Sequence, residues 1–335
     1  MRNAEHPSAS LAVGVVAAAS LALSGVTCAA AAPEGASAPE KKKIPVILDT
    51  DIGGDIDDTW ALIFLLRSPE LDLKLVTTDQ GNTVYRAKIV ARLLEVAGRT
   101  DVPIGIGIKE EDAEGGQAPW VKGYDLAKYP GKVHQDGVQA LIDTIMGSKE
   151  KITLICIGPV PNIKAALARE PRIAERARFV GMHGSIRRGY DGKKEPDAEW
   201  NVRANADACA AALSAAWDIT ITPLDTCGLV RLKGEKYAAV RDSKDPLARA
   251  LIENYRFWCG KNPENADKGS SVLFDTVAVY LSFSQDLCVM EKLNVRVTKE
   301  GRTVIDEKAK PMSCAMEWKD LSAFEDLLVK RIAPR

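Results

Sequence analysis

The sequence predicts an α/β fold with a mainly parallel β-sheet that carries helices on both faces. Short apolar runs of strand length alternate with helical patterns from residue 44 to about residue 225, as expected for successive β-α-β units. The runs are almost continuously apolar, which is typical of parallel strands covered on both sides. Because no linker or internal repeat interrupts residues 44–335, we expect one domain there.

The predicted strands are four to eight residues long and rich in Ile, Val and Leu. In chain order they are residues 44–49, 73–79, 102–107, 152–158, 177–182 and 219–225. In the predicted helices, apolar residues recur at spacings of three and four. These helices are residues 59–68, 83–98, 137–146, 162–170 and 206–217.

The pattern changes beyond residue 230. Residues 250–258 and 272–281 again have helical periodicity. Residues 293–306 (LNVRVTKEGRTVID) contain two β-prone runs around a Lys-Glu-Gly turn, which predicts a β-hairpin. We therefore expect the chain to end in a helical region and a hairpin.

The N-terminal segment resembles an export signal. Arg2 precedes an alanine-rich apolar run over residues 11–32, so residues 1–32 are predicted to be a signal peptide and residues 33–43 a flexible linker. This predicts a periplasmic or secreted protein without a membrane segment after cleavage. The alternatives are an uncleaved membrane anchor and lipid attachment at Cys28.

Charge and cysteine usage restrict the class of partner. Lys and Arg total 45 against 46 for Asp and Glu, so the chain has no net field that would attract nucleic acid or an anionic membrane. We expect a small-molecule ligand instead. Beyond the signal there are six cysteines without a CxxC pair, and we expect buried free thiols rather than disulfides.

An aspartate cluster follows the first predicted strand, around Gly53 and Gly54. Its members are Asp49, Asp51, Asp55, Asp57 and Asp58. Carboxylates this close repel one another unless a cation holds them. Oxygen ligands suit Ca²⁺ or Mg²⁺, and the lack of nearby His or Cys argues against zinc. Capping of the following helix explains one or two of these aspartates, but not five.

The cluster alone is compatible with two kinds of enzyme. Asp49 and Asp51 have the spacing of the nucleophile and the acid/base residue of haloacid-dehalogenase phosphatases. A phosphatase is therefore one alternative, and the other motifs of the chain must decide.

Five segments in order resemble the inosine-uridine-preferring nucleoside hydrolase family from about residue 44 to the C-terminal region. The first, DTDIGGDIDDTWAL, resembles the family's DxDxGxDDxxAL, with two additional residues before the paired aspartates. The others are TTDQGN (77–82), ITLICIGPVPNIKAAL (152–167), AEWNVRANADACAA (198–211) and VLFDTVAVYL (272–281). The resemblance implies a Rossmann-like core and hydrolysis of the N-glycosidic bond of ribonucleosides or related N-ribosides.

The resemblance also implies a set of roles. Ca²⁺ is expected to bind Asp51, Asp58, Asp275 and the backbone carbonyl of Ile157. Asp51 is expected to take a proton from a water that the Ca²⁺ holds beside the anomeric carbon. The residues expected to contact the ribose hydroxyls are Asp57, Asn82, Glu199 and Asn201. The two-residue insertion leaves Asp55 as an alternative to Asp57.

Two departures affect the rest of the substrate. Phe274 replaces a family histidine that is thought to protonate the leaving base, and Lys193 replaces an asparagine near the 5′-hydroxyl. His183 follows a predicted strand and is a candidate for lining the leaving-group pocket. These departures leave the nucleobase preference open. The sequence also leaves the oligomeric state open, although proteins of the family are commonly dimers or tetramers.

A non-catalytic protein is the alternative from another class. Such a protein would bind ribonucleosides through Ca²⁺ but would have lost turnover through Phe274. Tight nucleoside binding without release of a base distinguishes it from a hydrolase.

Overall fold

The computed structural model describes residues 14–17 and 42–334. Residues 42–334 belong to one compact unit. Most of the predicted signal peptide, and residues 33–41 of the predicted linker, lie outside the described residues. Within the described part of the chain, no helix has both the length and the apolar character needed to cross a bilayer.

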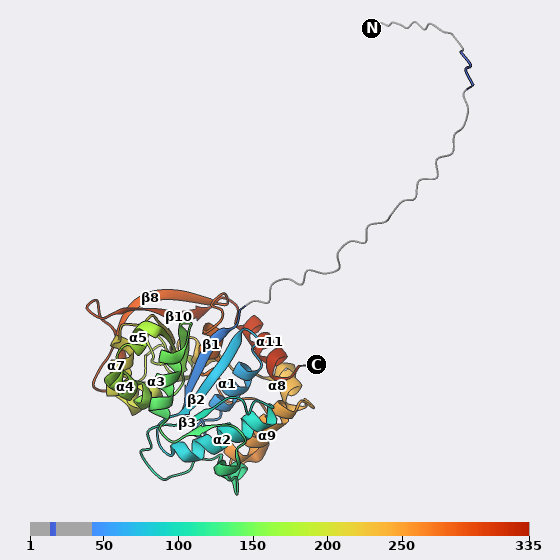
Figure 1. Ribbon diagram of the computed structural model, residues 1–335. Helices are drawn as coiled ribbons and strands as arrows, with labels where there is room; N and C mark the ends of the chain where they lie inside the picture. The colour runs from blue at the N-terminus through green and yellow to red at the C-terminus, as the bar shows by residue number, and fades with distance from the viewer. Residues whose placement is uncertain (1–13, 18–41, 335) are drawn as a thin grey trace. The chain divides into compact units, whose positions relative to one another are not determined.

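A ten-stranded sheet forms the centre of the fold, in the order β4-β3-β2-β1-β5-β6-β7-β10-β8-β9 (Figure 1). All strand pairs from β4 to β10 in this order are parallel, and β8 and β9 add antiparallel pairs at one edge. The strands are β1 (Ile44–Thr50), β2 (Leu71–Thr78), β3 (Ile104–Ile106), β4 (Val133–His134), β5 (Ile152–Cys156), β6 (Ala177–Met182), β7 (Ile219–Thr222), β8 (Cys288–Val297), β9 (Thr303–Ile305) and β10 (Pro311–Trp318).

Helices cover both faces of the sheet, as predicted. They are α1 (Asp57–Leu66), α2 (Thr83–Val96), α3 (Gly137–Gly147), α4 (Pro161–Arg169), α5 (Ile173–Arg176), α6 (Trp200–Ala204), α7 (Ala206–Ser214), α8 (Gly234–Arg241), α9 (Pro246–Trp258), α10 (Thr276–Leu281) and α11 (Leu321–Ile332). Short 3₁₀ turns are η1 (Ala118–Val121), η2 (Leu126–Lys128), η3 (Tyr190–Gly192), η4 (Cys227–Leu229) and η5 (Pro263–Asp267).

Each face of the sheet has its own hydrophobic core. Side chains alternate between the two faces along a strand, so Val46 and Leu48 of β1 pack into one core while Ile47 packs into the other. The first core includes residues of α1, α2, α8, α9, α10 and α11. The second includes residues of α3, α4, α5 and α7, which lie together on one side of the sheet in Figure 1.

The predicted hairpin is present as β8 and β9, but two strands were not predicted. β4 has only two residues, and β10 mixes polar and apolar residues at the C-terminal side of the hairpin. β10 pairs parallel with β7 and antiparallel with β8, which makes the hairpin part of the main sheet. The six described cysteines are free, and all but Cys259 are buried.

The strand order places a crevice at the centre of the sheet. From β1, the chain winds toward β2, β3 and β4 on one side and toward β5, β6 and β7 on the other. In open α/β sheets, ligands bind beyond the carboxyl ends of the strands at such a reversal. The loops after β1 and β5 are therefore the expected location of a site.

Candidate active site

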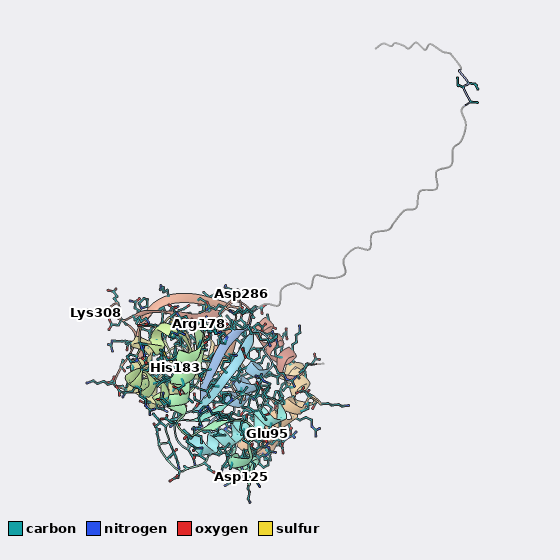
Figure 2. The ribbon with its side chains drawn as sticks, viewed as in Figure 1. Glu95, Asp125, Arg178, His183, Asp286 and Lys308 are labelled. Carbon is teal, nitrogen blue, oxygen red and sulfur yellow. The ribbon has the colours of Figure 1, made fainter. Side chains whose placement is uncertain are left out.

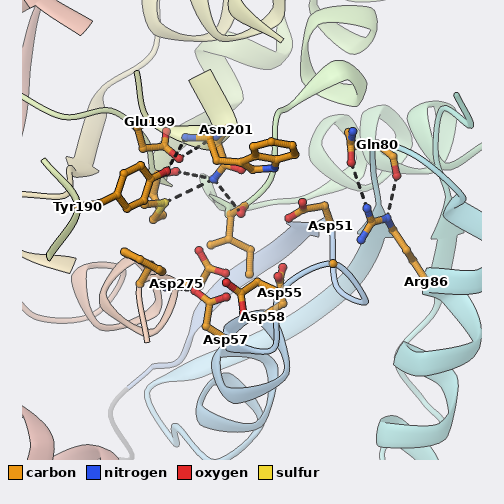
Figure 3. Close-up of a pocket in the computed structure, with 15 residues that line it drawn as sticks. Asp51, Asp55, Asp57, Asp58, Gln80, Arg86, Tyr190, Glu199, Asn201 and Asp275 are labelled. Atoms are coloured by element: carbon orange, nitrogen blue, oxygen red, sulfur yellow. Dashed lines mark hydrogen bonds between the residues drawn. The ribbon is translucent and has the colours of Figure 1, made fainter. Parts of the chain in front are cut away.

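A cavity of about 280 Å³ lies at this reversal, beyond the ends of β1 and β5 (Figure 3). This volume is near the lower end of the ~300–1,000 Å³ typical of small-molecule sites. It therefore suits a small ligand and not a folded macromolecule. The lining residues are Asp51, Gly54, Asp55, Asp57, Asp58, Gln80, Arg86, Ile157, Met182, Tyr190, Glu199, Trp200, Asn201, Phe274 and Asp275.

Three carboxylates meet on one wall of this cavity. Oxygens of Asp57, Asp58 and Asp275 lie within 4.8 Å of one another, and all three residues are buried. Asp57 and Asp58 form the first turn of α1, and Asp275 is the N-cap of α10. Two distant parts of the chain are thus brought together by the packing of these helix starts. The Asp275 amide donates to Asp57 Oδ2 at 3.3 Å, and Thr50 Oγ1 donates to Asp58 Oδ1 at 2.5 Å.

The electrostatics of this group favour a bound cation. Burial raises the pKa of Asp57, Asp58 and Asp275 well above the usual range, and neighbouring carboxylates raise each pKa further. A hard cation would supply the opposite charge that keeps such carboxylates ionised. Their grouping, burial and all-oxygen chemistry fit a metal of the Ca²⁺ or Mg²⁺ type.

Asp51 lies just beyond β1, between the cluster of Asp57, Asp58 and Asp275 on one side and the side chain of Arg86 on the other. It is only 8% exposed. Burial raises the pKa of Asp51, whereas the positive charge of Arg86 lowers it. Figure 3 shows Asp51 in the middle of the cavity, with Glu199 and Asn201 at one end and Gln80 and Arg86 at the other.

Glu199 and Asn201 are held at the start of α6. Glu199 accepts from the amides of Asn201 and Gly184 at 2.7 and 2.9 Å. Burial raises the pKa of Glu199 to about 7. Asn201 Nδ2 donates to the carbonyl oxygens of Ile157 and Met182 at 3.1 and 3.0 Å. The Asn201 amide therefore orients the Ile157 carbonyl that the sequence predicted as a ligand, and leaves its own Oδ1 for another partner.

Comparison with known proteins supports a family assignment for this arrangement. The model of the family described as inosine-uridine preferring nucleoside hydrolase matches residues 46–326. The chain belongs to this family. It is accordingly an N-ribosyl hydrolase, and the cavity lies where the family motifs converge.

Curated relatives match most of the chain. A non-specific ribonucleoside hydrolase of Klebsiella pneumoniae is 31% identical over 227 residues, covering 64% of this chain and 73% of the relative. A pyrimidine-specific ribonucleoside hydrolase of an Enterobacter species is 27% identical, covering 87% and 98%. The inosine-uridine preferring nucleoside hydrolase of Crithidia fasciculata is 26% identical, covering 78% and 85%.

Solved structures support the same fold. A plant nucleoside hydrolase superposes with a TM-score of 0.73 at 23% identity, covering 88% of this chain and all of that one. A purine-preferring ribonucleoside hydrolase from Gardnerella vaginalis has a TM-score of 0.69 at 23% identity, with coverage of 86% and 98%. The predicted α/β fold is therefore confirmed. The nucleoside hydrolase assignment replaces the haloacid-dehalogenase phosphatase alternative.

Two residues that the sequence predicted for the site lie elsewhere. Asn82 is outside the cavity lining: it is the N-cap of α2, accepts from the Tyr85 amide at 3.1 Å, and donates to the Asp112 carbonyl at 2.9 Å. Gln80, two residues earlier, lines the cavity instead. Both ends of the Asn82 amide are thus engaged at the helix start, and its expected contact with the ribose stays a prediction.

His183 is likewise outside the lining. It is fully buried just after β6 (Figure 2), where Nε2 contacts the Gly158 carbonyl at 3.1 Å and the ring packs against Phe179. Burial lowers the pKa of His183 to about 4, so the ring is neutral at physiological pH. It belongs to the protein interior and not to a leaving-group pocket.

The other sequence-derived candidates divide between the cavity and the surface. Asp55 and Asp57 both line the cavity, but Asp55 is exposed and Asp57 is buried beside Asp275. Phe274 also lines it and meets the Tyr190 ring edge to face. Lys193 is outside the lining and pairs with Asp197.

Several lining residues were not predicted from sequence. They are Gln80, Arg86 and Met182. Arg86 had a recognisable signal, because it shares a helical face with Val90 and Leu94, both fully buried, and a charged residue is rarely buried without a partner. Trp200 is 50% exposed at the cavity, unlike an ordinary structural tryptophan.

Proposed function

We propose that this protein hydrolyses the N-glycosidic bond of ribonucleosides, or of closely related N-ribosides, to the free base and ribose with the help of Ca²⁺. The observation that carries the proposal is the convergence of Asp51, the three-carboxylate group, Glu199 and Asn201 in one cavity of a nucleoside hydrolase fold. The relatives' names, which include non-specific, pyrimidine-specific and inosine-uridine-preferring enzymes, support the substrate class.

The metal would be held by Asp51, Asp58, Asp275 and the Ile157 carbonyl. All four residues line the cavity, and an all-oxygen ligand set is the one Ca²⁺ prefers. When bound, such a cation supplies positive charge that acidifies nearby water and hydroxyl groups. It also offsets the mutual repulsion of the buried carboxylates.

The side chains that line the cavity have separate roles in the reaction. Asp51 accepts the proton of the water that attacks the anomeric carbon, because it is a carboxylate at the centre of the cavity and beside the positive charge of Arg86. Asp57, Glu199 and Asn201 hydrogen-bond the ribose hydroxyls and favour the flattened sugar of an oxocarbenium-like transition state. This division predicts a preference for ribonucleosides over 2′-deoxyribonucleosides.

Export is a separate proposal that rests on sequence alone. We infer that residues 1–32 direct the chain out of the cytoplasm and are removed, so that the enzyme acts on external or periplasmic nucleosides. Mass spectrometry of the protein recovered from outside the cytoplasm tests this. A mature N-terminus among Ala29 to Pro33 is expected, and an intact N-terminus would contradict export with cleavage.

Release of base and ribose from ribonucleosides tests the enzymatic proposal. The purified chain is incubated with Ca²⁺ and uridine, cytidine, inosine, guanosine or adenosine, and both products are measured. Asp51→Asn keeps the shape of the side chain but cannot accept a proton, so we expect kcat to fall at least about 100-fold. Asp101→Asn is the matched control, because Asp101 is a surface residue paired with Arg99.

Two outcomes would contradict the proposal. Equal ribose release by the wild type and Asp51→Asn on every N-riboside would exclude Asp51 as the base. Tight nucleoside binding by the wild type with no product would instead favour the non-catalytic binding protein.

A further inference from the structure

The base that leaves in the proposed reaction becomes negatively charged, because the electron pair of the N-glycosidic bond goes to it. Phe274 lines the cavity at the position where the family commonly has a histidine, and its side chain has no proton to donate. The ionised carboxylates that line the cavity would repel an anion. The departing base therefore needs a hydrogen-bond donor from another residue.

Tyr190 lies beside Phe274 in the wall of the cavity. Both residues line it, and their ring centroids are 6.0 Å apart with the planes at 88°, an edge-to-face contact. Trp200 also lines the cavity and is 50% exposed. Among the described residues of the lining, these three are the only aromatic ones. They provide flat, apolar surfaces of the kind on which a nucleobase can stack.

The Tyr190 hydroxyl has a free proton. The Tyr190 amide donates to Asp197 Oδ2 at 2.9 Å, which fixes the backbone. The hydroxyl oxygen accepts from the Trp200 amide at 2.8 Å, and no described residue accepts the hydroxyl proton in return. Burial raises the pKa of Tyr190, and the nearby charge of Glu199 raises that pKa further, so the proton is retained at neutral pH. Tyr190 thus offers one positioned donor to a ligand.

Tyr190 lies on the side of the cavity from which a base would leave. In a direct displacement, water attacks one face of the anomeric carbon and the leaving group departs from the opposite face. The attacking water belongs beside Asp51, which has the positive charge of Arg86 next to it. In Figure 3, Tyr190 lies at the end of the cavity opposite Arg86, and Asp51 lies between them. Tyr190 therefore faces the departing base and not the water.

We propose that the Tyr190 hydroxyl donates a hydrogen bond to the departing base, in a pocket walled by Phe274 and Trp200, and stabilises the negative charge that develops on it. This inference rests on the proposed hydrolase function. Water forms the new C1′–O bond and gives a proton to Asp51, while the C1′–N electron pair stays on the base. Tyr190 keeps its proton, and the base takes one from solvent after it leaves. Pyrimidine O2 and purine N3 are both acceptors next to the glycosidic nitrogen, so one donor serves both classes of base.

Substrates that differ only in their leaving group test this role. Nucleobases are poor leaving groups, whereas 4-nitrophenyl β-D-ribofuranoside releases a phenolate that is stable without assistance. Tyr190→Phe removes only the hydroxyl and keeps the ring against Phe274. For this variant we expect kcat/KM on the ribonucleosides that the wild type cleaves to fall about 10-fold to 100-fold, mainly through kcat. On the nitrophenyl riboside we expect a loss of no more than about threefold.

The controls separate this role from a structural one. Tyr124→Phe removes a hydroxyl that donates to Glu95 at 2.7 Å outside the cavity, and it should leave the ratio of the two activities unchanged. Adding Phe274→His to Tyr190→Phe supplies an N–H donor at the neighbouring position and should restore part of the nucleoside activity. Calcium titration of Tyr190→Phe, monitored by calorimetry, should match that of the wild type, because Tyr190 is not a proposed ligand.

Three results overturn the assignment. An equal loss on both substrates would mean that the Tyr190 hydroxyl supports the sugar or the shape of the cavity. Unchanged nucleoside activity of Tyr190→Phe would remove the hydroxyl from the reaction. A wild type that cleaves the nitrophenyl riboside but no ribonucleoside would show hydrolysis without help to the base. By contrast, a wild type that cleaves neither kind of substrate would contradict the hydrolase function itself.

Discussion

The Asp58→Asn substitution should stabilise the protein when Ca²⁺ is absent and destabilise it, relative to the wild type, when Ca²⁺ is bound. Asp58 is fully enclosed beside Asp57 and Asp275, with oxygens within 4.8 Å of one another. Two unit charges at this distance repel by about 3.5 kcal/mol at an effective dielectric of 20. Because burial and the neighbouring charges raise the pKa of all three groups, protonation relieves part of this repulsion. When EGTA has removed Ca²⁺, the Asp58→Asn substitution should therefore raise the free energy of unfolding by about 1–2 kcal/mol.

Calcium should reverse that order. A ligand that binds only the folded state stabilises it by about 2.7 kcal/mol at 100 times its dissociation constant. The wild type should gain this amount, and Asp58→Asn should lose most of it because a neutral amide oxygen is a weaker ligand. The hydrogen bond from Thr50 is retained, since an asparagine Oδ1 can accept it. The substitution therefore tests charge rather than packing.

Thermal unfolding of both proteins in EGTA and in excess Ca²⁺ measures the effect. At about 2 °C per kcal/mol for a domain of this size, Asp58→Asn should melt about 2–4 °C above the wild type in EGTA and below it in Ca²⁺. Asp101→Asn should behave as the wild type in both. If Asp58→Asn melts lower in EGTA and gains as much from Ca²⁺ as the wild type, the three-carboxylate group is not the metal site.

Two further predictions concern pH and packing. Burial raises the pKa of Asp49 to about 6 from an ordinary value of 3.8, so the folded state holds this proton more tightly than the unfolded chain does. The stability that this proton contributes is present below about pH 4 and is lost as pH rises to about 6. In EGTA, urea midpoints should therefore fall over that range, and Asp49→Asn, which imitates the protonated carboxyl, should show a shallower fall; an unchanged slope would exclude Asp49 as a cause. Separately, Phe64 is fully buried on α1, with its ring centroid 6.3 Å from that of Phe324 on α11. Phe64→Ala should cost about 3–5 kcal/mol in urea unfolding, and a cost below about 1 kcal/mol would mean that the core closes around the gap.

The sequence predicted the site residues that follow the carboxyl ends of the strands. Asp51 directly follows a buried strand, and the Ile157 carbonyl follows the adjacent β5. Parallel strands of one sheet end on the same edge, so their following residues meet without any knowledge of side-chain packing. Asp57 and Asp58 were found for a similar reason, because both begin the helix that follows β1.

Two polar residues that the sequence assigned to the site have other partners in the structure. Asn82 was predicted to face the sugar, but the start of α2 has free amides and the Asn82 side chain satisfies one of them. His183 was a candidate for the cavity, but the Gly158 carbonyl lies within reach in the interior. Which partner a short polar side chain takes depends on distances of a few ångströms, and spacing along the chain does not determine these.

The sequence by itself determined the α/β fold class, the family and the acidic turn, because burial periodicity and local order along the chain are sufficient for them. The family resemblance had already linked Asp275 to the metal, but only the tertiary structure decided that its carboxylate lies within 4.8 Å of those of Asp57 and Asp58, and that Arg86 turns inward beside Asp51. The physical reason is that charge interactions depend on separation in space. Helix packing brings α1 and α10 together, and the left-handed turn at Gln80 directs Arg86 into the cavity.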